Sequence, residues 1–321
     1  MTTPPWWRSR DGAVSLVLAL GMIVSLGILA AATGWQETWA AVSALSALEV
    51  SILLALSLAN YILRGLRWIL FCRVIGAEVR VLQGLRHYLA GFAMTVTPGR
   101  VGELVRLRWL SRETGFPLDR ALPAALVDRA ADLAAAGVVL VICVALSGGA
   151  GFVPVALLSI VVAALVTRER LAREIVTRAW RVTGRWPRLF ARARRAARTL
   201  RPFSAPSVIT AALVLGALGW AAEGYALALL LDWLGADVSV PVAVAIFLFA
   251  MVTGASTGAP GGLGGAEVAL LGLLTLQGVP PAIALPATVI IRLTTLWFAL
   301  AIGVLIFPYA TWVSDRARTQ P

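Results

Sequence analysis

The chain has 321 residues, of which 60% are hydrophobic and only 14% are charged, and its formal net charge is +12. Apolar surface on this scale needs lipid to face, so the composition excludes an ordinary soluble domain and indicates an all-α polytopic membrane protein. All the basic residues are arginine, and in a membrane protein they report topology, so we expect no nucleic-acid partner. One histidine and two cysteines offer neither a metal cluster nor a nucleophile pair, so we expect no metal, no cofactor and no catalytic residue.

Hydrophobic runs of roughly 20 residues, each enough to cross about 30 Å of hydrocarbon, predict six full spans. In chain order these spans lie at about 13–33, 43–63, 121–146, 152–167, 207–231 and 284–307. The first is long for a signal peptide, so we interpret it as an uncleaved helix. Two further apolar segments, at about 82–112 and 240–277, are each interrupted by proline and glycine and are predicted to be re-entrant hairpins.

Arginine placement orients these elements by the positive-inside rule. The stretch 168–206 contains twelve arginines against two glutamates and is expected in the cytoplasm, either as amphipathic helices on an anionic leaflet or as a loop that fixes topology. Further arginines place both ends of the first broken segment on the same side: Arg64, Arg67, Arg73, Arg80, Arg86, Arg106, Arg108, Arg112 and Arg120. The loops near Glu37, 147–151 and 232–237 contain no arginine and are expected outside. Both chain ends are therefore expected in the cytoplasm, around a multi-pass domain of the cytoplasmic membrane.

On this topology, the first broken segment enters and leaves from the cytoplasm and the second from outside. We therefore expect one membrane domain, 1–321, that contains an inverted-topology repeat, with a first unit at about 43–146 and a second at about 207–307. The alternative interpretation makes each broken segment a pair of short full spans joined by a proline turn. Tryptophans near the predicted interfaces, among them Trp68, Trp109 and Trp312, are interpreted as aromatic belts, and His87 as an interfacial residue.

Two related motifs interrupt the broken segments. Residues 98–103 read Pro-Gly-Arg-Val-Gly-Glu, and residues 260–267 read Pro-Gly-Gly-Leu-Gly-Gly-Ala-Glu. Each motif ends on a glutamate, which an arginine follows 26 residues later at Arg129 or 25 residues later at Arg292. A charge at membrane depth costs several kcal/mol, so each glutamate is expected to pair with its arginine. Such pairs could also serve only to anchor each hairpin.

After each motif a half-helix begins, and its free N–H groups and positive dipole end favour an anion such as a phosphate head group. The predicted substrate-binding residues are Gly99, Arg100, Gly102, Glu103, Arg129, Gly261, Gly262, Gly264, Glu267 and Arg292. The supporting charges are Asp128, Asp132 and Glu223; the two aspartates, four residues apart, share one helix face. Paired acids also occur in hydrolases, but no nucleophile or metal accompanies these, so an intramembrane enzyme is the weaker interpretation.

These motifs, with the Asp-Arg-Ala-Ala-Asp segment at 128–132, resemble the flippase-like transmembrane domain family over about residues 10–310. That family includes the N-terminal membrane region of lysylphosphatidylglycerol synthases. Its second motif commonly reads Gly-Val-Arg-Glu, whereas residues 264–267 here read Gly-Gly-Ala-Glu, so any charge network that uses that arginine is missing. The chain ends about a dozen residues after the last predicted span, so we expect no soluble aminoacyl-transferase domain and no aminoacyl transfer.

The resemblance implies movement of a lipid between leaflets. We therefore expect a transporter of an anionic or glycosylated lipid, with a phosphate-bearing head group as its ligand. The first alternative is a non-transporting partner subunit of a glycosyltransferase or lipid-modifying enzyme, and the second is a carrier of small anions or ions.

Overall fold

The computed structural model describes residues 35–95, 97, 104–147, 150–167, 174, 177–178, 181 and 199–319. The secondary structure of these residues is helical and includes no strand. The predicted first span, the motif at 98–103 and most of the arginine-rich stretch lie outside the described residues.

The α-helices are α2 (Trp35–Ala44), α3 (Ala47–Val74), α4 (Val81–Gly91), α5 (Val105–Thr114), α6 (Leu118–Ser147), α7 (Val153–Thr167), α10 (Pro206–Trp233), α11 (Val240–Ser256), α12 (Gly265–Leu276), α13 (Pro281–Arg292) and α14 (Phe298–Thr319). Short 3-10 turns occur at Phe92–Met94, Ala150–Phe152, Arg201–Ser204 and Pro260–Gly262. A π-helical turn, Leu293–Trp297, joins α13 to α14.

Among the described residues, four helices are long and apolar enough to cross a membrane: Ala47–Val74, Leu118–Ser147, Pro206–Trp233 and Pro281–Ala317. At 1.5 Å per residue, the 28 residues of α3 extend for about 42 Å, which exceeds the roughly 30 Å of a hydrocarbon core. Shorter apolar helices accompany these four at Val153–Ala164, Val240–Ser256 and Pro260–Leu276. The chain is thus a multi-pass helical membrane protein, and the count of six spans stays a prediction.

Helix α3 differs from its predicted bounds. It begins after Ser46, which forms a reciprocal capping box with Glu49, and it continues to Val74 instead of ending near residue 63. Arg64 and Arg67 therefore lie inside the helix and are buried, so the interpretation of these two arginines as cytoplasmic loop residues is wrong. The helix continues through them because carboxylates of α6 neutralise both charges.

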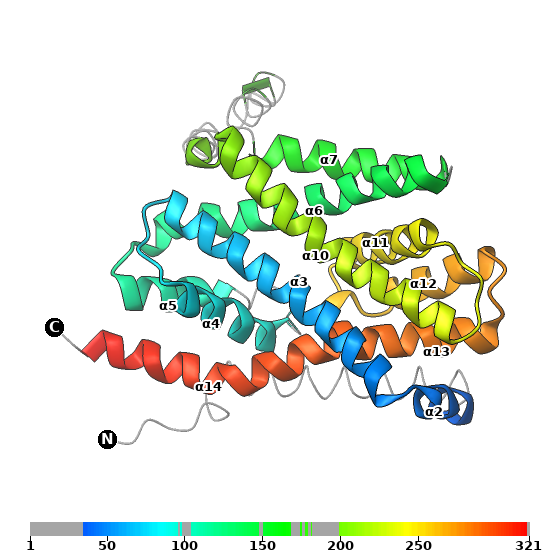
Figure 1. Cartoon of the computed structure of the whole chain (residues 1–321). Helices are drawn as coiled ribbons and strands as arrows, with labels where there is room; N and C mark the ends of the chain where they lie inside the picture. The colour runs from blue at the N-terminus through cyan, green and yellow to red at the C-terminus, as the bar shows by residue number, and fades with distance from the viewer. Residues whose placement is uncertain are drawn as a thin grey trace.

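Two other expectations are also corrected. The segment around Glu37 is not a plain loop, because α2 occupies it. The last helical rod is longer than the predicted 284–307, since α13, the π turn and α14 together run from Pro281 to Thr319. In Figure 1 this rod spans the width of the bundle, and α2 and the first turns of α3 lie below its α13 part.

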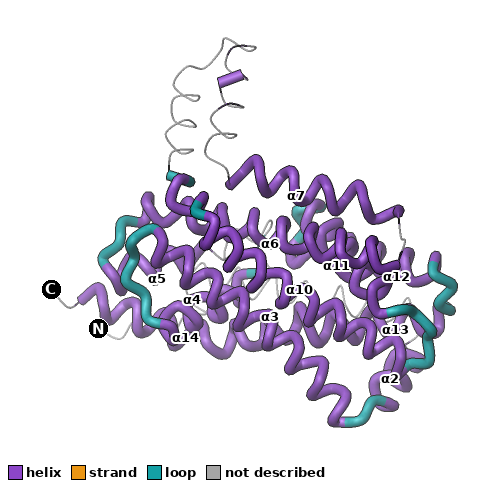
Figure 2. Tube along the Cα trace, turned by 45° about the horizontal axis from the view of Figure 1, so that its top comes forward, coloured by secondary structure: helices purple, strands orange, loops and turns teal. Residues whose placement is uncertain are grey.

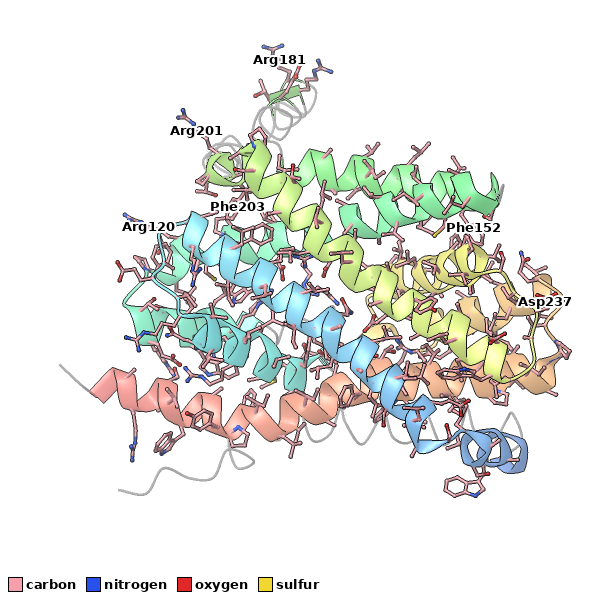
Figure 3. The ribbon with its side chains drawn as sticks, viewed as in Figure 1. Arg120, Phe152, Arg181, Arg201, Phe203 and Asp237 are labelled. Carbon is pink, nitrogen blue, oxygen red and sulfur yellow. The ribbon has the colours of Figure 1, made fainter. Side chains whose placement is uncertain are left out.

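The two broken segments lie at opposite ends of the bundle. In Figure 1, α4 and α5 lie at the end where α14 finishes, whereas α11 and α12 lie at the end where α13 begins. Figure 3 labels Arg120 and Arg201 toward the first end and Phe152 and Asp237 at the second. The loops gather mainly at these two ends (Figure 2), so the long axes of the helices run from one to the other.

Each broken segment packs into its own apolar core. One core gathers side chains of α10–α13 with the C-terminal half of α6, and includes Phe247, Leu270 and Ile291. The other gathers α3–α5 with the N-terminal half of α6, and includes Phe71 and Leu107. Helices α6 and α10 contribute to both cores, so they join the two parts of the molecule.

Candidate functional site

The second broken segment contains a glycine loop, residues 258–264, between α11 and α12. Gly258, Gly261, Gly262 and Gly264 all have φ between 62° and 81°, a left-handed conformation that side chains with a Cβ rarely adopt. The loop also packs tightly on α11, because a Cβ on Gly254 would lie 2.9 Å from the Ala266 nitrogen and 3.0 Å from the Gly262 oxygen. The predicted break is confirmed, and the run of glycines permits both its backbone angles and its close packing.

Arg292 and Glu267 form the predicted ion pair at this loop. The Arg292 Nε donates to Glu267 Oε1 at 2.6 Å, and both side chains are buried. The guanidinium also donates to the Gly261 carbonyl at 3.0 Å and contacts the Met251 sulfur at 3.5 Å. Arg292 therefore ties the end of α13 to the first turn of α12 and to the glycine loop. The pairing is confirmed, whereas the substrate-binding role of these residues stays a prediction.

The position of Glu267 has a second consequence. Its carboxylate lies in the first turn of α12, where the unpaired N–H groups and helix dipole favour a negative charge. Its Oε2 atom is buried without a hydrogen-bond partner among the described residues. The chain's own carboxylate thus already occupies the anion-favouring helix end that we predicted for a substrate phosphate.

A second buried set of charges, which we name the charge cluster, comprises Arg64, Arg67, Arg106, Asp128 and Asp132. Arg67 is fully buried and bridges both aspartates, at 2.8 Å to Asp128 and 2.6 Å to Asp132. Arg106 of α5 binds the other Asp128 oxygen at 2.8 Å, and Arg64 pairs with Asp132. The cluster therefore joins α3, α5 and α6 through charge-assisted hydrogen bonds.

Aromatic rings complete the surroundings of this cluster. The Arg106 guanidinium lies 4.0 Å from the centre of the Trp68 ring, and the Arg64 guanidinium lies 5.1 Å from that of Trp220 on α10. The Trp220 indole N–H donates to the Asp132 carbonyl at 3.2 Å. Desolvated guanidiniums gain most from such ring faces, so the aromatic side chains stabilise charges that water cannot reach.

Sequence reasoning found the carboxylates of this cluster but not their partners. Asp128 and Asp132 share a face, as predicted, whereas Arg64, Arg67 and Arg106 were interpreted only as topology markers. The available signal was spacing, because two arginines three residues apart on a helix can meet two aspartates four residues apart on another.

Two further predicted residues lie near the charge cluster. Glu223 is buried on α10, where its charge acts on Arg64, and Arg129 is partly buried on α6, where its charge acts on Asp128 and Asp132. Gly99, Arg100, Gly102 and Glu103 lie outside the described residues, so the proposed Glu103–Arg129 pair stays a prediction.

The belt and interface assignments are partly wrong. Trp68 and Trp109 are buried in the bundle, where Trp68 stacks on Arg106, and only Trp312 of the three inner tryptophans is exposed. His87 is also fully buried, and its Nε2 lies 3.0 Å from Glu113 Oε1. Gln83 and Arg86 bind the second Glu113 oxygen, so α4 and α5 are clamped together around one carboxylate.

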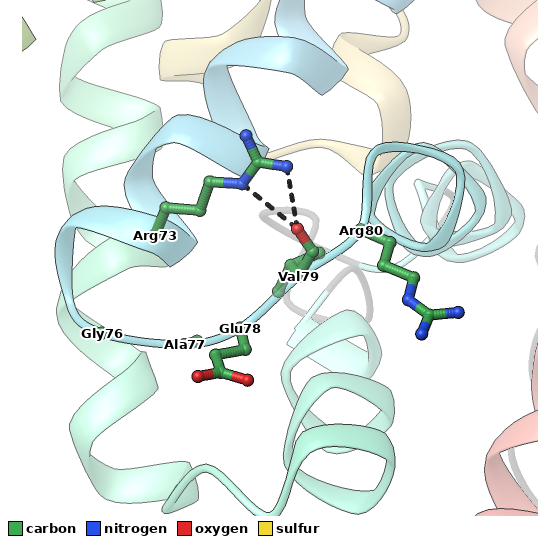
Figure 4. Close-up of a pocket in the computed structure, with 6 residues that line it drawn as sticks. All are labelled: Arg73, Gly76, Ala77, Glu78, Val79 and Arg80. Carbon is green, nitrogen blue, oxygen red and sulfur yellow. Dashed lines mark hydrogen bonds between the residues drawn. The ribbon is translucent and has the colours of Figure 1, made fainter.

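A surface depression at the turn between α3 and α4 provides a contrast with these buried sites. It is lined by residues 73 and 76–80, and the Arg73 guanidinium spans the turn to donate to the Val79 carbonyl at 3.1 and 3.0 Å (Figure 4). The depression is open to the surface, and Arg73, one of its two arginines, is already engaged in holding the turn. The candidate site is therefore the buried ionic interior.

The comparisons with known proteins agree with this architecture. The family described as the lysylphosphatidylglycerol synthase TM region matches residues 14–303. A UPF0104 membrane protein of Methanothermobacter thermautotrophicus is 26% identical, and the match covers 96% of this chain and 95% of that protein. A second UPF0104 membrane protein of the same organism is 25% identical over 94% of this chain and 96% of its own length. The chain therefore belongs to the family of lysylphosphatidylglycerol synthase transmembrane regions.

Proposed function

We propose that this protein moves an anionic or glycosylated lipid between the leaflets of the cytoplasmic membrane. The observation that carries the proposal is the helix break at the glycine loop, held by the buried Glu267–Arg292 pair. Non-helical backbone inside a membrane bundle is tolerated where protein buries it or where it lines a cavity, and in secondary transporters such breaks form the substrate site. A partner subunit that does not transport needs neither the helix break nor a charge pair buried beside it.

The arrangement of the helices supports alternating access as the mechanism. The two broken segments lie at opposite ends of the bundle, and each packs into its own core. In the proposed topology, α3–α6 and α10–α14 form an inverted repeat, with both chain ends in the cytoplasm. Rocking of one unit against the other exposes the interior to each leaflet in turn, and the cycle includes no chemical step.

Leaflet-resolved transport in reconstituted vesicles tests this proposal. Purified protein is placed in vesicles with fluorescent phosphatidylglycerol, fluorescent lysylphosphatidylglycerol or a glycosylated polyprenyl phosphate, and the fraction in each leaflet is measured over time. We expect faster exchange than in protein-free vesicles for at least one of these lipids, and loss of that exchange in Arg292→Gln.

The matched control is Arg112→Gln, because Arg112 forms an exposed ion pair with Asp315 at 2.7 Å. This variant should transport at the wild-type rate. Exchange no faster than in protein-free vesicles for all three lipids contradicts the proposal and favours the partner-subunit alternative.

A further inference from the structure

Buried polar atoms without partners gather where α3 crosses α10. Both side-chain atoms of Asn60 that can form hydrogen bonds are buried without a partner among the described residues, as are Arg64 Nε and Arg67 Nη1. An unpaired buried polar group destabilises the fold, so native structures rarely keep several together without a role. We name this contact between α3 and α10 the polar seam.

The opposite wall of the seam is one turn of α10 that contains two glycines. A Cβ on Gly219 would come closer to Asn60 Oδ1 than real Cβ atoms ever do, and a Cβ on Gly216 would lie 2.9 Å from Arg67 Nη1. Residues three apart on a helix have neighbouring Cβ positions, about 5–6 Å apart. The Asn60 amide and the Arg67 guanidinium therefore face adjacent positions on α10, and Arg64 faces Trp220 one residue further.

Packing alone does not account for Asn60. Polar side chains in membrane helices usually hydrogen-bond across to a neighbouring helix, yet the Asn60 amide finds no such partner in the described part of the chain. An apolar residue of similar size fills the same space without the desolvation cost. The Asn60 Nδ2 atom and the two guanidinium nitrogens are donors, so together they suit a hydrogen-bond acceptor that carries negative charge. The Asn60 Oδ1 atom is an acceptor and faces α10.

We propose that the polar seam binds an oxyanion, the phosphate of a lipid head group or a free phosphate, between Asn60, Arg64 and Arg67. This inference rests on the proposed function, because α3 and α10 are the corresponding helices of the two proposed repeat units. The structure shows the seam closed, with Gly216 against Arg67 Nη1 and Gly219 against Asn60 Oδ1. When α3 and α10 separate, the phosphate oxygens accept from the three unpaired donors, Asn60 Nδ2, Arg64 Nε and Arg67 Nη1, so the ligand favours the open state.

Thermal unfolding of the detergent-solubilised protein tests the binding site without requiring transport. The probes are inorganic phosphate, short-chain phosphatidylglycerol and a diacylglycerol of the same chain length, which lacks the phosphate. We expect the phosphate-bearing probes to raise the melting temperature of the wild type and the diacylglycerol to leave it unchanged. A shift with both phosphate probes indicates a free-phosphate ligand, and a shift with phosphatidylglycerol alone indicates a lipid head group.

Asn60→Leu separates a ligand site from a packing role. Because it removes an unpaired buried amide, it should raise the melting temperature of the ligand-free protein while binding weakens by about tenfold or more. Ser51→Ala, at an exposed serine on the same helix that bonds the Ala47 carbonyl, is the control and should bind as the wild type does. A full ligand shift in Asn60→Leu overturns the proposal, as does a wild type that no phosphate probe shifts.

A reversible cross-link gives an independent test of opening, in case Asn60→Leu does not fold. In a Cys72→Ala, Cys143→Ala background, cysteines at Asn60 and Gly219 lie close enough for a disulfide, since the Asn60 Cα is 3.4 Å from the Gly219 Cβ position. Oxidation should abolish the ligand-induced shift and lipid exchange, and reduction should restore both. The control pair, Gly137→Cys with Ser159→Cys, links α6 to α7, where the Cβ positions are 3.1 Å apart.

The control cross-link should leave both readouts unchanged, and an oxidised seam that still binds phosphate overturns the site.

The two proposals, the binding site and the transport function, fail differently. A ligand shift that depends on Asn60, in a protein that moves no lipid, retains the site and rejects the transport function. Lipid exchange that survives both Asn60→Leu and the seam disulfide rejects the site alone.

Discussion

Single residues matter most in this protein where a charge is buried, because removing one partner leaves the other without compensation. Arg292 illustrates this, since its guanidinium binds Glu267 and the Gly261 carbonyl in one geometry. Its planar fork of donors suits such a role better than the ammonium of a lysine. The consequence is that the glycine loop, α12 and α13 depend on one side chain.

A double-mutant cycle measures this dependence. Glu267→Gln should lower the free energy of unfolding by about 3–5 kcal/mol, because it leaves the Arg292 charge buried and unpaired. Adding Arg292→Gln should recover part of the loss, so the coupling energy should be well above zero. The same cycle on the exposed pair Arg112–Asp315 should give less than about 1 kcal/mol. Equal coupling in the two cycles would show that the buried pair has no special role.

The clamp between α4 and α5 predicts a pH dependence of stability. Burial raises the pKa of Glu113, but the contacts with His87, Gln83 and Arg86 outweigh it and hold the pKa below its ordinary value. A carboxyl with a depressed pKa stabilises the fold fully above its unfolded-state pKa, near 4.3, and this contribution is lost as the pH falls through the folded-state value.

The wild type should therefore lose more stability than Glu113→Gln when the pH is lowered from about 7 to about 3. Melting temperatures of the two proteins across this range provide the measurement, with Asp315→Asn as the exposed control. Parallel curves for wild type and Glu113→Gln would contradict the assignment of the clamp.

At the scale of the helices, close approach depends on small residues. Gly303 of α14 packs directly on the backbone of the turn after α4, where a Cβ would overlap the Ala93 nitrogen and the Phe92 carbonyl carbon. Gly272 of α12, in contrast, has open space where its Cβ would be. The two glycines thus occupy equally helical backbone in opposite packing environments.

Gly303→Ala should accordingly destabilise the protein by about 1–3 kcal/mol through overpacking. Gly272→Ala should stabilise it by up to about 1 kcal/mol, because alanine loses less backbone entropy in a helix. Unfolding of both variants in the same detergent measures the difference. If both substitutions had the same effect, the contact of α14 with the turn after α4 would not be as close as the structure shows.

Hydrophobic runs and motif spacing predicted most of the helices and the Glu267–Arg292 pair, because each depends on local sequence and on the cost of an unpaired charge. They did not predict the partners of Asp128 and Asp132. The positive-inside rule counts arginines and does not distinguish one in a loop from one buried in a bundle, so Arg64 and Arg67 were assigned to the membrane surface. The available signal was helical spacing. Asn60, Arg64 and Arg67 lie on one face of α3, which indicates that the two arginines face the same buried partners.

At the scale of the whole molecule, the central question is whether the two broken segments enter from opposite sides. Their placement at opposite ends of the bundle makes a direct prediction for labelling from outside intact cells. Cysteines at Glu78 and Asp119, which flank the first segment and are exposed, should be protected. Cysteines at Asp237 and Gln277, which flank the second and are also exposed, should react.

The native cysteines, Cys72 and Cys143, are buried and free, so they should contribute little background to this labelling. Membrane-permeant reagent should label all four introduced sites and serves as the control for accessibility. Reaction of all four sites from outside would contradict the inverted repeat. It would not affect the assignment of the buried ion pairs, which does not depend on topology.

The π turn at Leu293–Trp297 has a consequence for how one rod serves both parts of the molecule. A π turn holds one residue more than an α turn, and each residue of an α-helix advances the side chains by about 100°. The faces of α13 and α14 are therefore out of phase, so α13 can direct Arg292 at α12 while α14 directs Gly303 at the turn after α4. The Tyr61 hydroxyl donates to the Thr295 carbonyl inside the π turn, which marks the place where the rod changes phase. The π turn thus lets one continuous rod present differently oriented faces to two partners. Deleting one residue from the turn would rotate α14 relative to α13, so either Arg292 would lose its contact with α12 or Gly303 would lose its contact with the turn after α4.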